Sequence, residues 1–174
     1  MVADAGSAGF ASDDVDSFGA WLEPLLPAGY RLALGMLRNR DDAEDAVQEA
    51  AAKAWRRRSS FRAEADPRPW FLAIVANECK MARRKSWLAG RWFRAAAVHE
   101  AEAPADSDEV DQLRQGLSRL GSGARLALVL RFYLDLSYDD VGRTLGVTAA
   151  AARVRVHRAL ATLRADVAEE LRDG

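Results

Sequence analysis

The stretch from Leu136 to Arg164 constrains the fold of this chain most strongly, because it encodes two helices joined by a tight turn. Ser137 is a suitable N-cap for the first helix, with Asp140 three residues later. Gly146 supplies the backbone freedom that the turn needs, and Thr148 is a second N-cap. Apolar residues then recur every three or four positions: Ala152, Val156, Leu160, Leu163 and Val167. The pattern predicts a helical hairpin whose second helix buries one face.

The opposite face of this second helix is basic. At about 100° per residue, Val154, His157 and Arg158 point outward together, with Arg153 beside them. The helix carries no carboxylate before Asp166. Two capped helices with a glycine turn and a basic second helix suit insertion into a DNA major groove. The sequence therefore predicts a DNA-binding helix-turn-helix, and an ordinary hairpin with solvated arginines is the alternative.

Charge is segregated along the chain, although the formal net charge is only −1. Residues 1–52 hold ten acids against three bases, and residues 53–94 hold twelve bases against three acids. Residues 95–113 hold six acids and neither Lys nor Arg. Such blocks indicate two kinds of partner, one basic and one acidic.

Several classes of function find no support in the sequence. Cys79 is the single cysteine, and His99 and His157 lie far apart without neighbouring ligands, so we expect no disulfide, metal site, cofactor or histidine-based catalysis. No signal peptide and no apolar run of membrane-spanning length is present, which predicts a cytoplasmic protein that does not insert into a membrane. Helix-forming residues dominate and strand signals are nearly absent, so the predicted fold class is all-α.

The first half of the chain begins with a small, acidic tail at 1–13, followed by two amphipathic helices in 15–37 that are interrupted near Pro24, Pro27 and Gly29. A strong helix is predicted over 39–58, with Asp41 and Glu44 as its start signal. An acidic strip lies along it: Asp42, Asp45, Gln48 and Glu49. This strip fits a basic partner. The alternatives are a solvated, dipole-matched helix and a magnesium-dependent nuclease, for which opposing ligands are not evident.

A loop is predicted over 59–69, presenting Phe61 next to Arg62, and a second long helix follows. Its expected buried side comprises Phe71, Leu72, Val75, Cys79 and Ala82. Asn77, Lys80 and Arg84 then project together from the other side. An amide and cations beside a loop aromatic suit a track for single-stranded nucleic acid. The alternative is a core aromatic with a solvated run of charges.

Residues 95–110 have the composition of a flexible, acidic linker. The chain is therefore predicted to form two small helical domains, 14–94 and 111–170, on either side of it. In the second domain, short helices are expected over 111–120 and 125–134, before the helix-turn-helix.

These segments together resemble the extracytoplasmic-function (ECF) group of bacterial RNA polymerase sigma factors, the minimal type with only the second and fourth sigma domains. Residues 42–49, DAEDAVQE, resemble the group's D-A-E-D-x-V-Q-E signature, and Phe61-Arg62 with residues 69–77, PWFLAIVAN, resembles its F-R…W-L…I-A-x-N segment. Residues 130–133, LRFY, with 136–138, LSY, and Gly146-Val147 resemble its L-R…L-S-Y…G-V. Residues 153–159, RVRVHRA, fit its closing R-x-R-x-H-R-A. The resemblance covers nearly the whole chain.

The resemblance implies a role for each predicted surface. The strip Asp42, Asp45, Gln48 and Glu49 would dock on clamp helices of core RNA polymerase. Promoter DNA would be bound at two places. The minus-ten element, as a melted single strand, would meet Phe61, Arg62, Asn77, Lys80 and Arg84. The duplex minus-thirty-five element would meet Thr148, Arg153, Val154, His157 and Arg158.

The resemblance also implies that residues 126–136 would pack on the polymerase flap, and that an anti-sigma factor is a further candidate partner. The chain would itself catalyse no reaction. Ala151 and Val154 stand where the group commonly has hydroxyl residues, so Val154 is expected to contact a thymine methyl group instead. A stand-alone helix-turn-helix regulator remains the alternative function.

Overall fold

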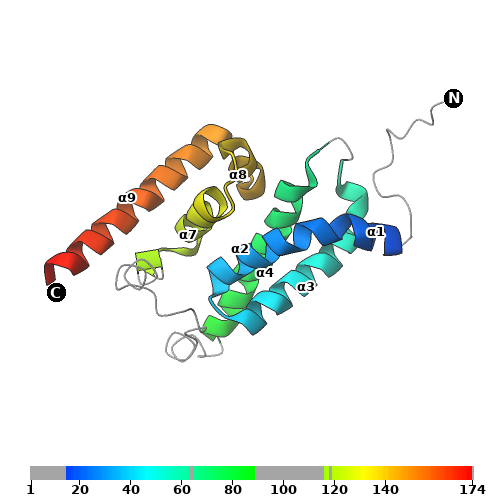
Figure 1. Ribbon diagram of the computed structural model, residues 1–174, viewed down its shortest axis with the longest axis horizontal. Helices are drawn as coiled ribbons and strands as arrows, with labels where there is room; N and C mark the ends of the chain where they lie inside the picture. Colours follow the sequence, from blue (N-terminus) through cyan, green and yellow to red (C-terminus); the bar gives the residue numbers. More distant parts are fainter. Residues whose placement is uncertain (1–14, 63–64, 89–115, 118, 174) are drawn as a thin grey trace. The chain divides into compact units, whose positions relative to one another are not determined.

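The computed structural model describes residues 15–62, 65–88, 116–117 and 119–173. Within these ranges the regular elements are all helices and none is a strand, which confirms the predicted all-α class (Figure 1). The helices form two compact units, one N-terminal and one C-terminal. The predicted linker, residues 95–110, lies outside the described residues, so the exact domain boundaries stay a prediction.

The N-terminal unit is a helical bundle. Its elements in chain order are α1 (Val15–Leu22), the 3₁₀ turn η1 (Glu23–Leu25), α2 (Leu26–Leu37), α3 (Arg40–Arg56), the 3₁₀ turn η2 (Arg58–Ser60) and α4 (Pro67–Leu88). The predicted break near Pro24 is present as η1. Pro27 lies in the first turn of α2, where a missing N–H costs no hydrogen bond.

Gly29 lies inside α2, contrary to the prediction that it helps to interrupt the helix. The reason is close packing against α4. A Cβ atom added at Gly29 would lie 2.8 Å from Cε1 of Phe71. Glycine is therefore needed here for the approach of two helices and does not mark a turn.

The helix α3 begins at a different cap from the one expected. Arg38 closes α2 with a left-handed backbone, φ 57°. Asn39 is then the N-cap of α3, because its Oδ1 accepts a hydrogen bond from the Asp42 N–H at 2.8 Å. The predicted start signal, Asp41 with Glu44, is thus wrong, and Asp41 and Asp42 instead occupy the first turn, where the helix dipole favours acids.

Small side chains let α3 pack closely against α2. The buried residues of α3 are Ala43, Ala46, Ala50 and Ala54. On α4 the prediction holds for Phe71, Leu72, Val75 and Cys79, which are all buried, while Ala82 is only half-buried. The helix starts at Pro67, inside the segment predicted as loop, and Asp66 Oδ1 accepts a hydrogen bond from the Arg68 N–H at 2.9 Å.

The C-terminal unit contains α7 (Ser122–Leu128), a π-helical stretch (Val129–Tyr133), α8 (Tyr138–Leu145) and α9 (Ala149–Asp173). The helix expected over 125–134 is present, but it starts earlier and its last turn widens into the π-helix. The helix expected over 111–120 lies largely outside the described residues. The helix α7, with buried leucines at 126 and 128, packs against α9, whose buried residues include Ala152, Val156 and Leu163.

The predicted helix-turn-helix is confirmed at each of its caps. The Asp140 N–H donates to Ser137 Oγ at 3.1 Å, and the Ala151 N–H donates to Thr148 Oγ1 at 3.2 Å. Gly146 has a φ of 67°, in the left-handed region that favours glycine. A Cβ atom at Gly142 would lie 2.8 Å from the Val147 carbonyl oxygen, so α8 touches the turn directly.

Candidate functional site

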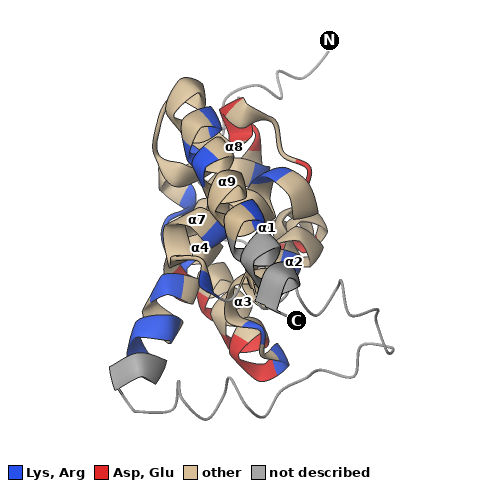
Figure 2. Cartoon of the chain, turned by 90° about the vertical axis from the view of Figure 1, so that its left-hand side faces the viewer, with Lys and Arg blue, Asp and Glu red and all other residues tan. Residues whose placement is uncertain are grey.

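The outward face of α9 carries the predicted duplex-binding residues. Val154 is 48% exposed, and Arg153, His157 and Arg158 are also exposed. Ala152, Val156 and Ala159 are buried on the opposite side, so packing against the rest of the unit fixes which face is free. Figure 2 shows basic residues along this helix. Thr148 is exposed at the helix start, where it serves as the N-cap.

Arg153 lies over an aromatic ring from the neighbouring helix. Its guanidinium carbon is 5.0 Å from the ring centroid of Tyr138, the first residue of α8. A second guanidinium, that of Arg131, is 5.3 Å from the same centroid. Arg131 also pairs with Asp135 at 3.0 Å, and its side chain is 30% exposed. Two cations near the start of α9 therefore share one aromatic ring.

The long helix α4 presents its polar residues on one side. Asn77, Lys80 and Arg84 are exposed and follow one another at spacings of three and four, so they form one continuous face. Basic residues mark the C-terminal part of α4 in Figure 2. The buried residues Phe71, Val75 and Cys79 hold the helix from the opposite side. The predicted single-strand track is thus available at the surface.

The acidic strip lies on the outer face of α3. Asp45, Gln48 and Glu49 are exposed, and Asp42 is half-buried because it lies in the capped first turn. The start of α3 carries the cluster of acidic residues visible in Figure 2. This face lies opposite the buried alanines, so binding there would leave the α2–α3 packing intact.

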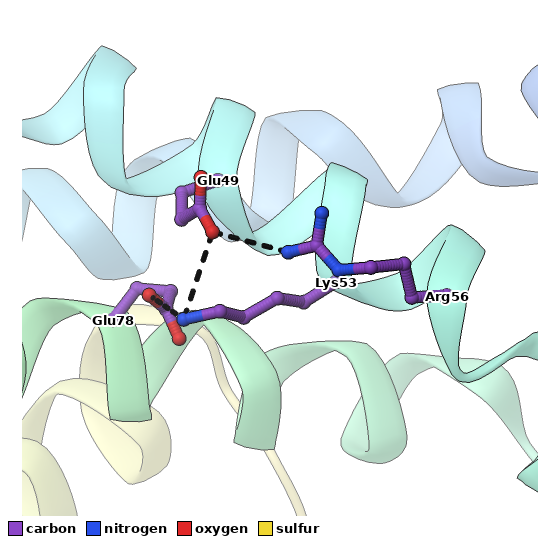
Figure 3. Close-up of polar contacts among 4 residues, drawn as sticks. All are labelled: Glu49, Lys53, Arg56 and Glu78. Carbon is purple, nitrogen blue, oxygen red and sulfur yellow. Dashed lines mark hydrogen bonds and ion pairs between the residues drawn. The ribbon is translucent and has the colours of Figure 1, made fainter.

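A network of charged side chains joins α3 to α4 (Figure 3). Glu49 Oε1 lies 3.1 Å from Arg56 Nη2 and 3.7 Å from Lys53 Nζ. Lys53 Nζ also donates to Oε2 of Glu78, on α4, at 2.6 Å. The Glu78 side chain is only 8% exposed, so Lys53 neutralises a carboxylate that is almost out of water.

Sequence reasoning missed this network. Lys53 lies in the last turn of α3, where a cation also complements the helix dipole, and its partner Glu78 is 25 residues away in the sequence. The usable signal was Glu78 itself, an acid between the buried positions Val75 and Cys79. A carboxylate at such a position needs a cation from a neighbouring helix.

Comparisons with known proteins match both units to one family. A family profile described as Sigma-70 region 2 matches residues 21–88, and one described as Sigma-70, region 4 matches residues 111–163. The ECF RNA polymerase sigma factor SigM of Mycobacterium tuberculosis is 32% identical over 136 residues, which cover 77% of this chain and 68% of that protein. The chain belongs to the ECF sigma factors.

Two further relatives agree with this membership. The RNA polymerase sigma factor CarQ of Myxococcus xanthus is 31% identical over 137 residues, covering 74% of this chain and 76% of CarQ. Among solved structures, the sigma factor RpoE from Bartonella quintana, in complex with the anti-sigma factor NepR, aligns with a TM-score of 0.68 at 27% identity. That alignment covers 88% of this chain and 98% of RpoE.

The loop over 59–69 was predicted to expose Phe61, but in the structure this side chain points inward. The Phe61 side chain is only 7% exposed. Its ring centroid is 5.2 Å from that of Trp21 and 5.3 Å from that of Trp70. A large apolar ring gains more from this aromatic cluster than from water, so the loop folds it inward. Arg62, the next residue, is exposed.

The segment 126–136, which the resemblance predicts to meet the polymerase flap, buries its leucines. Leu126, Leu128, Leu130, Leu134 and Leu136 all lie in the core of the C-terminal unit. The large apolar side chains left at the surface of 126–136 are Phe132, 57% exposed, and Tyr133, 54% exposed. Both lie in the π-helical stretch, which turns consecutive aromatics outward.

The nuclease alternative gains no ligand set from the fold. Among the residues described here, no group of three or more His, Cys, Asp or Glu side chains is placed to hold a metal ion. Within the same residues, no helix is both long enough and apolar enough to cross a bilayer.

Proposed function

We propose that this ECF sigma factor divides promoter recognition between its two units. The N-terminal unit binds core RNA polymerase through α3 and holds the melted minus-ten strand on α4. The C-terminal unit reads the duplex minus-thirty-five element with α9. The observation that carries this proposal is the exposure of Asn77, Lys80 and Arg84 on one face of a helix whose other face is buried. Their availability to a strand depends on no rearrangement of the fold.

The exposed face of α9 supports major-groove binding. Arg153 and Arg158 supply cations for phosphates or base edges, and His157 adds a donor between them. Val154 is 48% exposed in the middle of this face, where its methyl groups suit contact with a thymine methyl. Affinity for the promoter should therefore fall with rising salt, because phosphate contacts release counterions.

The exposed face of α4 supports capture of single-stranded DNA. Lys80 and Arg84 provide charge along a backbone, and Asn77 provides an amide that can both donate and accept hydrogen bonds to a base. Phe61 is buried, so the exposed Arg62 is the residue of this loop that we propose to contact a flipped base. Binding of the unpaired strand stabilises the open promoter, so the chain does not need to hydrolyse a nucleotide to open it.

Two exposed surfaces support binding to core RNA polymerase. Asp45, Gln48 and Glu49 on α3 form the acidic strip proposed to dock on the clamp helices. Within the segment 126–136, the exposed Phe132 and Tyr133 are the residues proposed to contact the flap. Since RNA polymerase acts in the cytoplasm of bacteria, we place the protein there.

An anti-sigma factor is a further candidate partner. The sigma factor RpoE that aligns with this chain was solved bound to the anti-sigma factor NepR. We propose that such a partner would bind the same surfaces of this chain as core RNA polymerase and would therefore compete with it.

Run-off transcription with purified core RNA polymerase on genomic promoter fragments tests the proposal. Specific initiation should depend on the added chain. A stand-alone regulator would bind duplex DNA by itself without affinity for the polymerase, and a nuclease would cleave the fragments in magnesium. Absence of chain-dependent initiation on every promoter would contradict the proposed function.

A further inference from the structure

The best-defined feature that the proposed function leaves unexplained is Tyr138. It is the first residue of α8, directly after the N-cap Ser137, whose Oγ accepts the Asp140 N–H at 3.1 Å. The cap holds the backbone of this first turn in place, and with it the Cα atom from which the Tyr138 side chain extends. Tyr138 is half-buried, and two guanidinium groups from different elements lie near its ring.

The two cations play different parts. Arg131 comes from the π-helical stretch and is already held, because it pairs with Asp135 at 3.0 Å and donates to the Leu136 carbonyl at 3.3 Å. Arg153 comes from α9, and its guanidinium carbon lies 5.0 Å from the Tyr138 centroid. Within the described part of the chain no carboxylate pairs with Arg153. Its charge is therefore available to DNA while its position is set by the ring.

A flexible arginine loses conformational freedom when it binds DNA, and a contact that restricts it beforehand lowers this cost. Tyr138 supplies such a contact through the attraction between a cation and the face of an aromatic ring. Arg131, anchored on the same ring, adds a second positive charge beside the start of α9.

We propose that Tyr138 is a positioning residue that holds Arg153 ready for the upstream duplex, with Arg131 as a second cation near the same ring. This inference rests on the proposed reading of the minus-thirty-five element by α9. It assigns to α8 a specific share in DNA recognition, in addition to its packing against α9.

The test uses the full chain assembled with core RNA polymerase and measures the affinity of this holoenzyme for a promoter it transcribes. Tyr138→Leu keeps the apolar volume but removes the ring, and should weaken promoter binding about two- to fivefold, the range of an exposed cation–π contact. Tyr138→Phe keeps the ring and should restore wild-type affinity. Affinity for core polymerase and the thermal unfolding midpoint should be the same in both variants.

A double-mutant cycle with Arg153→Ala separates positioning from packing. In the Arg153→Ala background, Tyr138→Leu should cause no further loss of promoter affinity. An equal loss in both backgrounds, or no loss in either, would overturn the positioning role. If Arg153→Ala alone leaves promoter affinity unchanged, Tyr138 has no DNA-binding arginine to position and the inference fails. The proposed DNA-reading face of α9 fails only if Arg153→Ala with Arg158→Ala also leaves promoter affinity unchanged, so the two failures are distinguished.

Discussion

At the scale of single residues, the most consequential contact is the ion pair between Lys53 and Glu78. The pair joins α3, which carries the acidic strip, to α4, which carries the residues proposed to face the single strand. Lys53 also lies 3.7 Å from Glu49 in the strip (Figure 3). One lysine thus fixes two proposed binding surfaces relative to each other within the N-terminal unit.

Lys53→Met should destabilise the N-terminal unit by about 3 kcal/mol, because the Glu78 carboxylate is left without its cation in a buried place. Tryptophan fluorescence during urea unfolding measures this, since Trp21, Trp55 and Trp70 lie in the N-terminal unit. Adding Glu78→Gln should recover much of the loss, as the unpaired charge is then removed. Additive losses in the double variant would show that the two side chains do not act as a pair.

Residues whose positions depend on partners close in the sequence were easier to predict than residues whose partners are distant in the sequence. The caps Ser137 and Thr148 and the turn glycine Gly146 were predicted correctly, because each is determined by neighbours within three or four residues. The inward Phe61 was not, because its burial depends on Trp21, 40 positions earlier in the printed chain. Local pattern cannot reveal a partner that only the tertiary fold brings near.

At the scale of elements, each helix with a proposed function has one face packed and one face free. The periodicity of α4 and α9 predicted this division correctly, and so it located Asn77, Lys80 and Arg84 at the surface. Element ends were less predictable. The start of α4 at Pro67 and the widening of 129–133 into a π-helix depend on packing that the sequence pattern does not encode.

Asn77→Ala combined with Lys80→Ala should weaken open-complex formation more than binding to core polymerase, because these residues are proposed to bind the strand and are not part of the acidic strip. Permanganate reactivity of unpaired thymines reports opening, and a binding titration reports core affinity. Arg31→Ala, which removes one exposed cation from α2, is the matched control and should affect neither. Equal losses in both assays would contradict the assignment of this face.

Gly142→Ala should destabilise the helix-turn-helix by about 1–3 kcal/mol, because the added methyl group would lie 2.8 Å from the Val147 carbonyl oxygen. The backbone of the turn cannot move away without breaking the contact between α8 and α9. Hydrogen exchange across residues 138–160 should therefore become faster. Gly123→Ala in α7 is the control, since nothing lies within 4 Å of its added methyl group, and exchange should stay as slow as in the wild type.

At the scale of the whole molecule, the segregation of charge along the sequence matches two surfaces with different chemistry. The acidic residues of α3 and Lys80 of α4 lie in the N-terminal unit, and the cations of α9 lie in the C-terminal unit. Membership of the ECF sigma factors gives each surface a proposed partner. The central claim is that single-strand capture and duplex reading are separate tasks of separate units.

A two-template binding assay with the reconstituted holoenzyme tests this claim most directly. One fragment carries a premelted minus-ten element without an upstream element, and the other carries only duplex with the minus-thirty-five element. Arg153→Ala with Arg158→Ala should lower affinity about tenfold for the duplex alone, because base and phosphate contacts are lost there. Asn77→Ala with Lys80→Ala should lower affinity for the premelted fragment alone. Equal losses of both variants on both fragments would contradict the division of labour.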